Sequence, residues 1–582
     1  MPPEHRRSPI PTLRRILRSL VVILALIAPS VGSAQSVQSL QTPAESFDLP
    51  EREPREPEEE ERILPIVVPR SQPDRLGGGQ PVRVSSFQFE GNTVFTDAEL
   101  AALLAPLADR DITTQELQTA RDTLTRHYID NGYVTSGAMI PDQEVSDGVV
   151  TFRIVEGRLA SVRAEGTRFF RGSYFERRLM LGSDKPLRIQ DLEQRLQIFQ
   201  EDWRIKRIAS QLDPGERRGE AVLRLRIDEA APLRTLAEWS NNTPSNLGEQ
   251  TGRFVLGLPN LLGIGDEFTA QLRATQGLID YELDYGVPIT PWDTQLRGRY
   301  RRSSGEVVEG PLTAGGAEFT SSAWTAGIGL VQPLIRTQNT TLSAALLGEW
   351  RRSETKIDGF GFGFPGTGAD QDTGVSKIGV ARTALDWLYR TRTQVFAVRQ
   401  ILSVGLPVWD ATENSSRVPD TNFVSSFTQL RLAVRMPRYE NLELVMRSDL
   451  QLSNHPLMPL EQIGAGGLDT VRGYPDNELV RDQAVIASIE LRAQIYRSSN
   501  GRHRLQLAPF VDFAQGWDRK RAGVEPRKDR TLLSLGMGFR YRMARLLRAE
   551  VYWGLGRNAD ESDAAVGLQQ HGVHFRLRAD FP

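Results

Sequence analysis

The sequence predicts a transmembrane β-barrel of about 16 antiparallel strands, preceded by two α/β domains of similar order. Three observations lead to this fold class. The chain starts with an export signal, the next part repeats one β-α-α-β-β order, and the part after residue 230 alternates apolar and polar residues. In 582 residues, 71 Lys and Arg nearly balance 73 Asp and Glu, which argues against a nucleic-acid-binding protein.

Residues 1–34 have the pattern of a secretory signal peptide. Several Arg between Arg6 and Arg18 precede the short apolar run Leu20–Ala28, and small residues follow up to Ala34. A membrane-spanning helix needs roughly 20 apolar residues, so we expect cleavage after Ala34 instead. The mature protein is then periplasmic, secreted or a β-barrel. The chain contains no Cys, which excludes disulfides and a Cys nucleophile.

Residues 35–80 are rich in proline, and Glu51–Arg62 consists mostly of Glu, Arg and Pro. Low hydrophobicity with repeated proline predicts an extended linker. The alternative is a tether or a plug segment.

Residues 81–157 form the first expected α/β unit. Thr113, with Glu116 three residues later, has the spacing of a capping box, and Asn131-Gly132 stops that helix. The expected elements are a strand over Val82–Phe89, a helix over Ala98–Leu107 capped by Thr96 or Asp97, a helix between Thr113 and Asn131, and strands over Tyr133–Ile140 and Val149–Val155.

Residues 158–230 repeat that order. Gly166 follows the first strand here, as Gly91 does in the first unit. A shared order in two units of similar length indicates a structural duplication; the alternative is chance order in a mixed α/β protein. The expected elements are strands over Leu159–Glu165, Ile205–Leu212 and Ala221–Ile227, and helices over Ser173–Leu181 and Ile189–Trp203.

Residues 231–582 carry the barrel prediction. Long strands, near the roughly 9–11 residues that a tilted spanning strand needs, are separated alternately by short turns and by long Gly-rich loops such as Asp358–Gly374. In a barrel the apolar face meets lipid and the Arg-bearing face lines a wet lumen; a soluble sandwich is the alternative. One example of alternation is Leu535, Met537 and Phe539 against Gly536, Gly538 and Arg540.

Candidate chemistry is sparse. His571 and His574 stand three apart, which in a strand puts them on opposite faces of the barrel wall, so we expect no shared metal. Gly361–Gly366 matches GxGxxG but lacks the strand and helix of a dinucleotide site. We therefore expect no catalytic residue, no metal and no cofactor, and a protein that is not an enzyme.

Two features resemble a known family. The β-α-α-β-β units resemble POTRA domains, and Val471-Arg472-Gly473-Tyr474 matches the VRGY/F loop signature of POTRA-bearing barrels. The whole chain resembles the two-partner secretion transporters (TpsB, haemolysin-activator-like). The resemblance implies an outer-membrane barrel with periplasmic POTRA domains. It also implies export of a secreted partner, a large β-helical adhesin or cytolysin.

The resemblance also implies a site. In that family the VRGY loop folds into the lumen and its Arg meets an Asp of an F-x-D-x-G strand motif. Here the pair would be Arg472 and Asp512, with Phe510 as a second barrel-wall partner; Ala514 replaces the usual Gly. Alternation independently puts Asp512 on the lumen face, opposite Val511. The alternative is that the two residues do not pair, in which case Arg472 is a solvated loop residue and Asp512 is one of many charges on the wall.

Further expectations concern partners, a plug helix and rival functions. Outer-membrane lipid surrounds the barrel, and the barrel-assembly machinery inserts it. The sequence departs from the family at the N-terminal plug helix that the family often has, because Pro43 breaks the one segment with room for it. A barrel-assembly insertase is the main alternative function, although such proteins tend to carry more POTRA units. A passive porin would need no arm.

Overall fold

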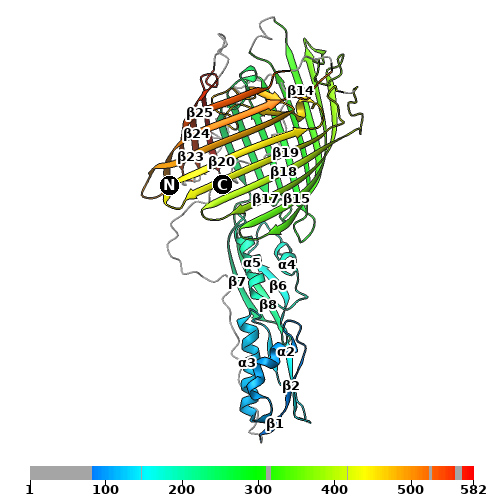
Figure 1. Ribbon diagram of the computed structural model, residues 1–582, viewed down its shortest axis with the longest axis vertical. Helices are drawn as coiled ribbons and strands as arrows, with labels where there is room; N and C mark the ends of the chain where they lie inside the picture. Colours follow the sequence, from blue (N-terminus) through cyan, green and yellow to red (C-terminus); the bar gives the residue numbers. More distant parts are fainter. Residues whose placement is uncertain are drawn as a thin grey trace, which may run out of the picture.

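The computed structural model describes residues 81–145, 147–309, 316–415, 417–522, 527–544, 546–557 and 567–581. The expected signal peptide and proline-rich segment, with any plug helix, lie outside these residues. Figure 1 shows a barrel from which an arm of two stacked units extends, with α4 (Gly172–Leu179) and α5 (Ile189–Gln200) next to the barrel and β1 (Val82–Val84) at the far end.

The first unit has the expected strands and helices with two differences: the strand expected over Val82–Phe89 is split after Val84, and a short strand over Arg110–Ile112, which was not expected, pairs with its first part. Thr96 with Glu99, and Thr113 with Glu116, form capping boxes at the starts of its two α-helices. Its main sheet has the strand order β2-β5-β4, in which β2 and β5 are parallel. The elements are β1 (Val82–Val84), β2 (Ser86–Glu90), α2 (Asp97–Leu104), η3 (Ala105–Leu107), β3 (Arg110–Ile112), α3 (Thr114–Asp130), β4 (Gly137–Met139) and β5 (Val149–Val155).

The second unit repeats this arrangement, with the sheet order β6-β8-β7 and β6 parallel to β8. Its elements are β6 (Arg158–Glu165), α4 (Gly172–Leu179), α5 (Ile189–Gln200), β7 (Ile205–Pro214) and β8 (Glu220–Glu229).

Two expected elements were too long. The strand expected from Tyr133 is only β4, because the chain turns there and Ser136 N donates to Tyr133 O (3.0 Å). The second helix of the second unit ends at Gln200, so Trp203 does not continue its apolar stripe. Trp203 is 43% exposed and lies under the guanidinium of Arg234 (4.6 Å).

Equivalent glycines follow the first main-sheet strand of each unit. Gly91 has φ +85° and Gly166 has φ +81°, a region that L-residues avoid. A Cβ at Gly91 would lie 2.6 Å from Ile154 O, and one at Gly166 would lie 2.9 Å from Ile227 O. The two units therefore share the backbone conformation at this position as well as the order of their elements.

Equivalent carboxylates then fasten the loop after each glycine. Glu156 accepts hydrogen bonds from Thr93 N (2.7 Å) and Val94 N (2.8 Å), and Glu229 accepts one from Phe169 N (2.6 Å). Although partial burial raises the pKa of Glu156, the hydrogen bonds from Thr93 and Val94 hold it below its usual value.

Each unit has its own apolar core. The buried residues of the first core all come from residues 84–154, and those of the second from residues 159–227. Neither core includes a barrel residue, so the arm can fold without the barrel.

The barrel closes on itself, and all its neighbouring strands are antiparallel. It has 16 strands that run the length of the wall, which confirms the expected number; β16 (Phe360–Gly361) is a two-residue addition beside β15. Closure comes from β27 pairing with β9, where Phe581 lies opposite Thr235. The strands are β9 (Arg234–Ser240), β10 (Thr251–Pro259), β11 (Glu267–Ala274), β12 (Leu278–Pro288), β13 (Gln295–Glu306), β14 (Phe319–Arg336), β15 (Thr340–Ile357), β17 (Val375–Arg390), β18 (Gln394–Leu406), β19 (Val424–Met436), β20 (Tyr439–Ser453), β23 (Gln483–Arg497), β24 (His503–Trp517), β25 (Arg530–Met543), β26 (Leu547–Gly556) and β27 (Val573–Phe581).

The alternation has the expected sense. On β25 the outward Leu535 is 61% exposed, whereas its neighbour Ser534 is 1% exposed. The lumen face departs from a polar lining on β17 and β18, where Ile378, Val380 and Ile401 are buried. These apolar residues pack against a loop inside the barrel. Among the helices in the described part of the chain, none is long and apolar enough to cross a membrane.

The arm is fastened to the near end of the barrel. Arg178 of α4 donates through Nε to Asp293 Oδ1 (2.7 Å) in the turn between β12 and β13. Arg171 N donates to Gly263 O (2.8 Å) in the turn between β10 and β11. These contacts hold the second unit against the barrel rim.

Candidate functional site in the barrel lumen

A long loop between β20 and β23, residues 454–482, folds into the barrel; we call it the lumen loop. It contains η5 (Pro459–Glu461), β21 (Ile463–Ala465) and β22 (Leu479–Arg481), and β21 pairs with β22 to form a stem. Beyond the stem lies the tip, with Val471 and Tyr474 fully buried. The sequence motif therefore lies in the lumen, enclosed by the barrel wall.

The structure brings Arg472 of this tip onto Asp512 of β24. The guanidinium donates from Nε to Asp512 Oδ2 (2.8 Å) and from Nη2 to Asp512 Oδ1 (2.9 Å), and Arg472 N donates to the same carboxylate (3.0 Å). Arg472 is 1% exposed and Asp512 is 0% exposed. A bidentate, buried pair of this kind fixes orientation as well as distance.

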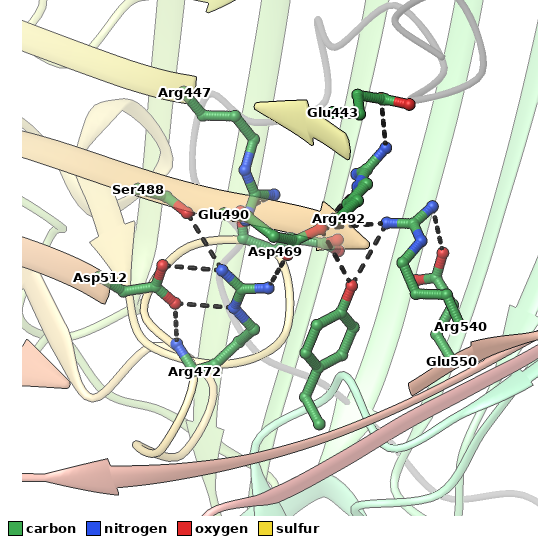
Figure 2. Close-up of polar contacts among 11 residues, drawn as sticks. Glu443, Arg447, Asp469, Arg472, Ser488, Glu490, Arg492, Asp512, Arg540 and Glu550 are labelled. Atoms are coloured by element: carbon green, nitrogen blue, oxygen red, sulfur yellow. Dashed lines mark hydrogen bonds and ion pairs between the residues drawn. The ribbon is translucent and has the colours of Figure 1, made fainter. Parts of the chain in front are cut away.

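Other wall residues complete the seat of Arg472, and Figure 2 shows the polar contacts with Ser488 and Glu490. Nη1 contacts Glu490, and Nη2 donates to Ser488 Oγ (3.1 Å), both on β23. The guanidinium lies over the rings of Phe510 (3.7 Å) and Tyr552 (4.6 Å), which adds cation–π attraction. Phe510, the second expected wall partner, thus contacts Arg472 through its face.

The charges continue along the wall beyond Arg472 (Figure 2). Glu490 also accepts from Arg492 Nε (2.6 Å), and Arg492 Nη1 lies 3.3 Å from Glu443. Arg540 lies 3.5 Å from Glu490 and 2.9 Å from Glu550. Because acidic and basic groups alternate here, Glu490 and each of these four neighbours lie beside a charge of opposite sign.

The other motif residues have separate contacts. Gly473 N donates to His574 Nε2 (3.0 Å) on β27, and the Tyr474 hydroxyl donates to Leu533 O (3.1 Å). Val471 belongs to an apolar cluster with Ile401 and others on the wall.

Sequence reasoning missed four contributors to this seat: Ser488, Glu490, Tyr552 and His574. Alternation puts each of them on the lumen face, but it gives no partner for them. The expectation for His571 was wrong: it lies in the turn before β27, where its N–H donates to Leu568 O (3.1 Å), and not in the strand.

Glycines of the tip and of the wall let the loop approach the wall closely. Gly473 has φ +91°, and a Cβ there would lie 2.6 Å from Ser534 Oγ. A Cβ at Gly554 of β26 would lie 2.8 Å from Gly473 N. At Gly556 it would lie 2.8 Å from the Tyr474 ring. The tip therefore touches backbone on β26, which only glycine permits.

Comparison with known proteins identifies the family. Residues 219–541 match the family model of the haemolysin secretion/activation proteins ShlB/FhaC/HecB, and residues 82–157 match the ShlB-type POTRA domain. The chain belongs to the ShlB/FhaC/HecB family. Membership places the barrel in the outer membrane and the POTRA domain in the periplasm.

Similar proteins agree with this family. The outer-membrane transporter CdiB of Escherichia coli O6:K15:H31 is 29% identical over 209 residues, which cover 36% of this chain and 35% of that protein. The match thus spans about a third of that relative. A solved structure of CdiB from Escherichia coli superposes with a TM-score of 0.64 at 20% identity, covering 88% of this chain and 93% of that one. BamA from Haemophilus ducreyi lacking POTRA domains 1–3 gives 0.53 at 13% identity, covering 86% and 100%. At these identities the structures share the fold alone.

Proposed function

We propose that this protein exports a secreted partner protein through its barrel to the cell surface. The observation that carries the proposal is the lumen loop. A loop held by side-chain contacts occupies the interior of a 16-strand barrel, beside an arm that reaches into the periplasm. Such a loop can leave its seat without unfolding the wall, so the same lumen can be closed at rest and open to a chain.

The arm is proposed to recognise the partner. We take residues 81–157 and 158–230 as two POTRA domains, 35–80 as a linker after a signal peptide over 1–34, and 231–582 as the barrel. The edge strands β2, β4, β6 and β7 of the two sheets can bind an extended segment through backbone hydrogen bonds. The partner proposed is a large β-helical adhesin or cytolysin that arrives unfolded.

The VRGY tip is proposed to gate or brace the barrel. Arg472 with Asp512 and Phe510 forms the lock, while Val471, Gly473 and Tyr474 seat the loop around it. Folding of the partner outside the cell prevents its return, so the proposal includes no nucleotide, cofactor or catalytic step. Surrounding lipid and the barrel-assembly machinery complete the set of proposed partners.

Deleting the gene and comparing proteins tests the proposal. Loss of one large protein from the culture medium supports export. A general loss of barrels from the outer membrane supports the insertase alternative instead. The likeness to BamA shows a shared fold and does not favour that alternative.

Two variants test the roles within the exporter. Arg472→Ala should strongly reduce secretion while the barrel still inserts; normal secretion by this variant contradicts the gate-or-brace role. Deletion of residues 82–156 should stop secretion yet leave ion conductance in planar bilayers. If secretion survives that deletion, the partner docks elsewhere.

A further inference from the structure

A second buried cluster of charges holds the lumen loop, and it contains none of the VRGY residues. Glu461, in η5 near the start of the loop, accepts from Arg382 Nη2 through both oxygens (2.7 and 3.0 Å). Arg351 Nη1 lies 3.1 Å from Glu461 and donates to Leu460 O (3.1 Å). Glu349 accepts from Arg382 Nε (2.7 Å) and Arg351 Nη2 (2.8 Å).

The cluster is electrically balanced and buried. Its two Arg and two Glu side chains are each at most 4% exposed. Removing one member leaves an uncompensated buried charge, which is strongly unfavourable. Its polarity is the reverse of that at Arg472: here the loop brings the carboxylate and the wall supplies the arginines.

The two clusters bind the loop to wall strands that lie on opposite sides of the point where the loop leaves β20. In the strand order, β15 and β17, which carry Glu349, Arg351 and Arg382, lie on one side of β20. The strands β23 and β24, which hold Arg472, lie on the other side. The loop therefore bridges the two parts of the wall across the lumen.

Apolar contacts add to the second charge cluster in holding the loop. Leu457, Met458 and Leu460 of the loop pack with Ile378 and Val380 of β17. This contact explains why β17 carries apolar residues on its lumen face. It also means that the Glu461 end of the loop has a seat of its own, separate from that of the tip.

We propose that Glu461, with Arg382 and Arg351, is a second positioning site, and that the loop leaves the lumen only when both charge clusters break. This inference deepens the proposed function and rests on it for its meaning in export. The seating of the loop can nevertheless be measured without any partner. Because release requires both clusters to break, weakening either one raises the fraction of molecules with the loop released. When both are weakened, the two fold-increases in that fraction multiply.

A unique thiol between the two anchors reports release. Ala465 is 1% exposed and lies in β21, and the chain has no natural Cys, so Ala465→Cys introduces one buried label site. In intact cells a membrane-impermeant maleimide should label this residue slowly. Adding Glu461→Gln should raise the labelling rate roughly tenfold or more, because it breaks a buried ion pair.

The matched control is Glu354→Gln. Glu354 is on β15, as Glu349 is, but its side chain is 24% exposed and pairs with Arg352 and Lys356. This control should label at the parent rate. Heat-modifiable migration in gels checks that each barrel is folded; if Glu461→Gln does not assemble, Arg382→Lys, which keeps the charge but loses the fork, takes its place.

Four outcomes are informative. Labelling of Glu461→Gln at the control rate overturns the proposal, and so does a double variant with Arg472→Ala that labels no faster than Arg472→Ala alone. Faster labelling, with the two factors multiplying, supports it. Faster labelling with unchanged secretion supports the anchor and counts against loop release as a step in export, so the two proposals fail separately.

Discussion

The contact between Gly554 and the VRGY tip allows a purely steric test of the lumen loop. A Cβ at position 554 would lie 2.8 Å from Gly473 N and 2.9 Å from both the carbonyl carbon and oxygen of Arg472. All three are backbone atoms, so no side chain can rotate away to relieve the clash. Gly554→Ala therefore pushes the tip away from β26 without removing a charge or a hydrogen bond.

The magnitude follows from the cost of overpacking. One methyl group forced into a filled site costs about 1–3 kcal/mol. If the tip leaves instead of the wall moving, the ratio of seated to released loop falls roughly fivefold to 150-fold. The same push lengthens the Arg472–Asp512 hydrogen bonds, which now measure 2.8 and 2.9 Å.

Conductance of the purified protein in planar bilayers measures this ratio, and the amount of partner in the medium measures its consequence. We expect channels of Gly554→Ala to open more often or for longer than those of the wild type. The amount of partner in the medium should change as well. Gly298→Ala on β13 is the control, since a Cβ there has nothing within 4 Å. If the two variants behave alike in both assays, the reasoning that the tip is held against β26 is refuted.

Three further predictions concern other contacts. Arg472→Lys keeps the charge but cannot make the fork to Asp512, so secretion should fall by about tenfold; wild-type amounts of exported protein would show that charge alone suffices. Asp293→Asn keeps a side chain that tolerates the φ of +60° at that position but loses the charge that faces Arg178. The junction should weaken by about 1 kcal/mol and become more sensitive to protease, while conductance stays unchanged; unaltered proteolysis would contradict this. Glu156→Gln should destabilise a soluble fragment of residues 81–230 by about 1–2 kcal/mol at pH 7, measured by thermal unfolding. The pKa of Glu156 is lowered in the folded state, so its contribution is present above about pH 4.5 and is lost as the pH falls through the folded pKa. The difference between wild type and variant should therefore shrink in acid, and a difference that persists at low pH would exclude this cause.

Local patterns in the sequence were enough for much of the fold. Capping at Thr96 and Thr113 and the glycine after each first strand depend on residues within a few positions, and the structure confirms both. Strict alternation predicted a barrel wall because side chains on a strand alternate between two faces. The parity of Asp512 followed from the same rule. Where local signals competed, as at Tyr133 and Trp203, the ends of elements were wrong.

Tertiary structure alone decided what the lumen loop touches. Glu461 and Arg382 are 79 residues apart, and Gly473 and His574 are 101 residues apart. Alternation gives the face of a strand residue but not the height at which a loop meets it. Barrel closure and the path of the loop set that height, and they determine which buried charges become partners. The sequence by itself thus determined a barrel with an arm and a motif, while the three-dimensional structure determined that the loop is held both near its start and at its tip.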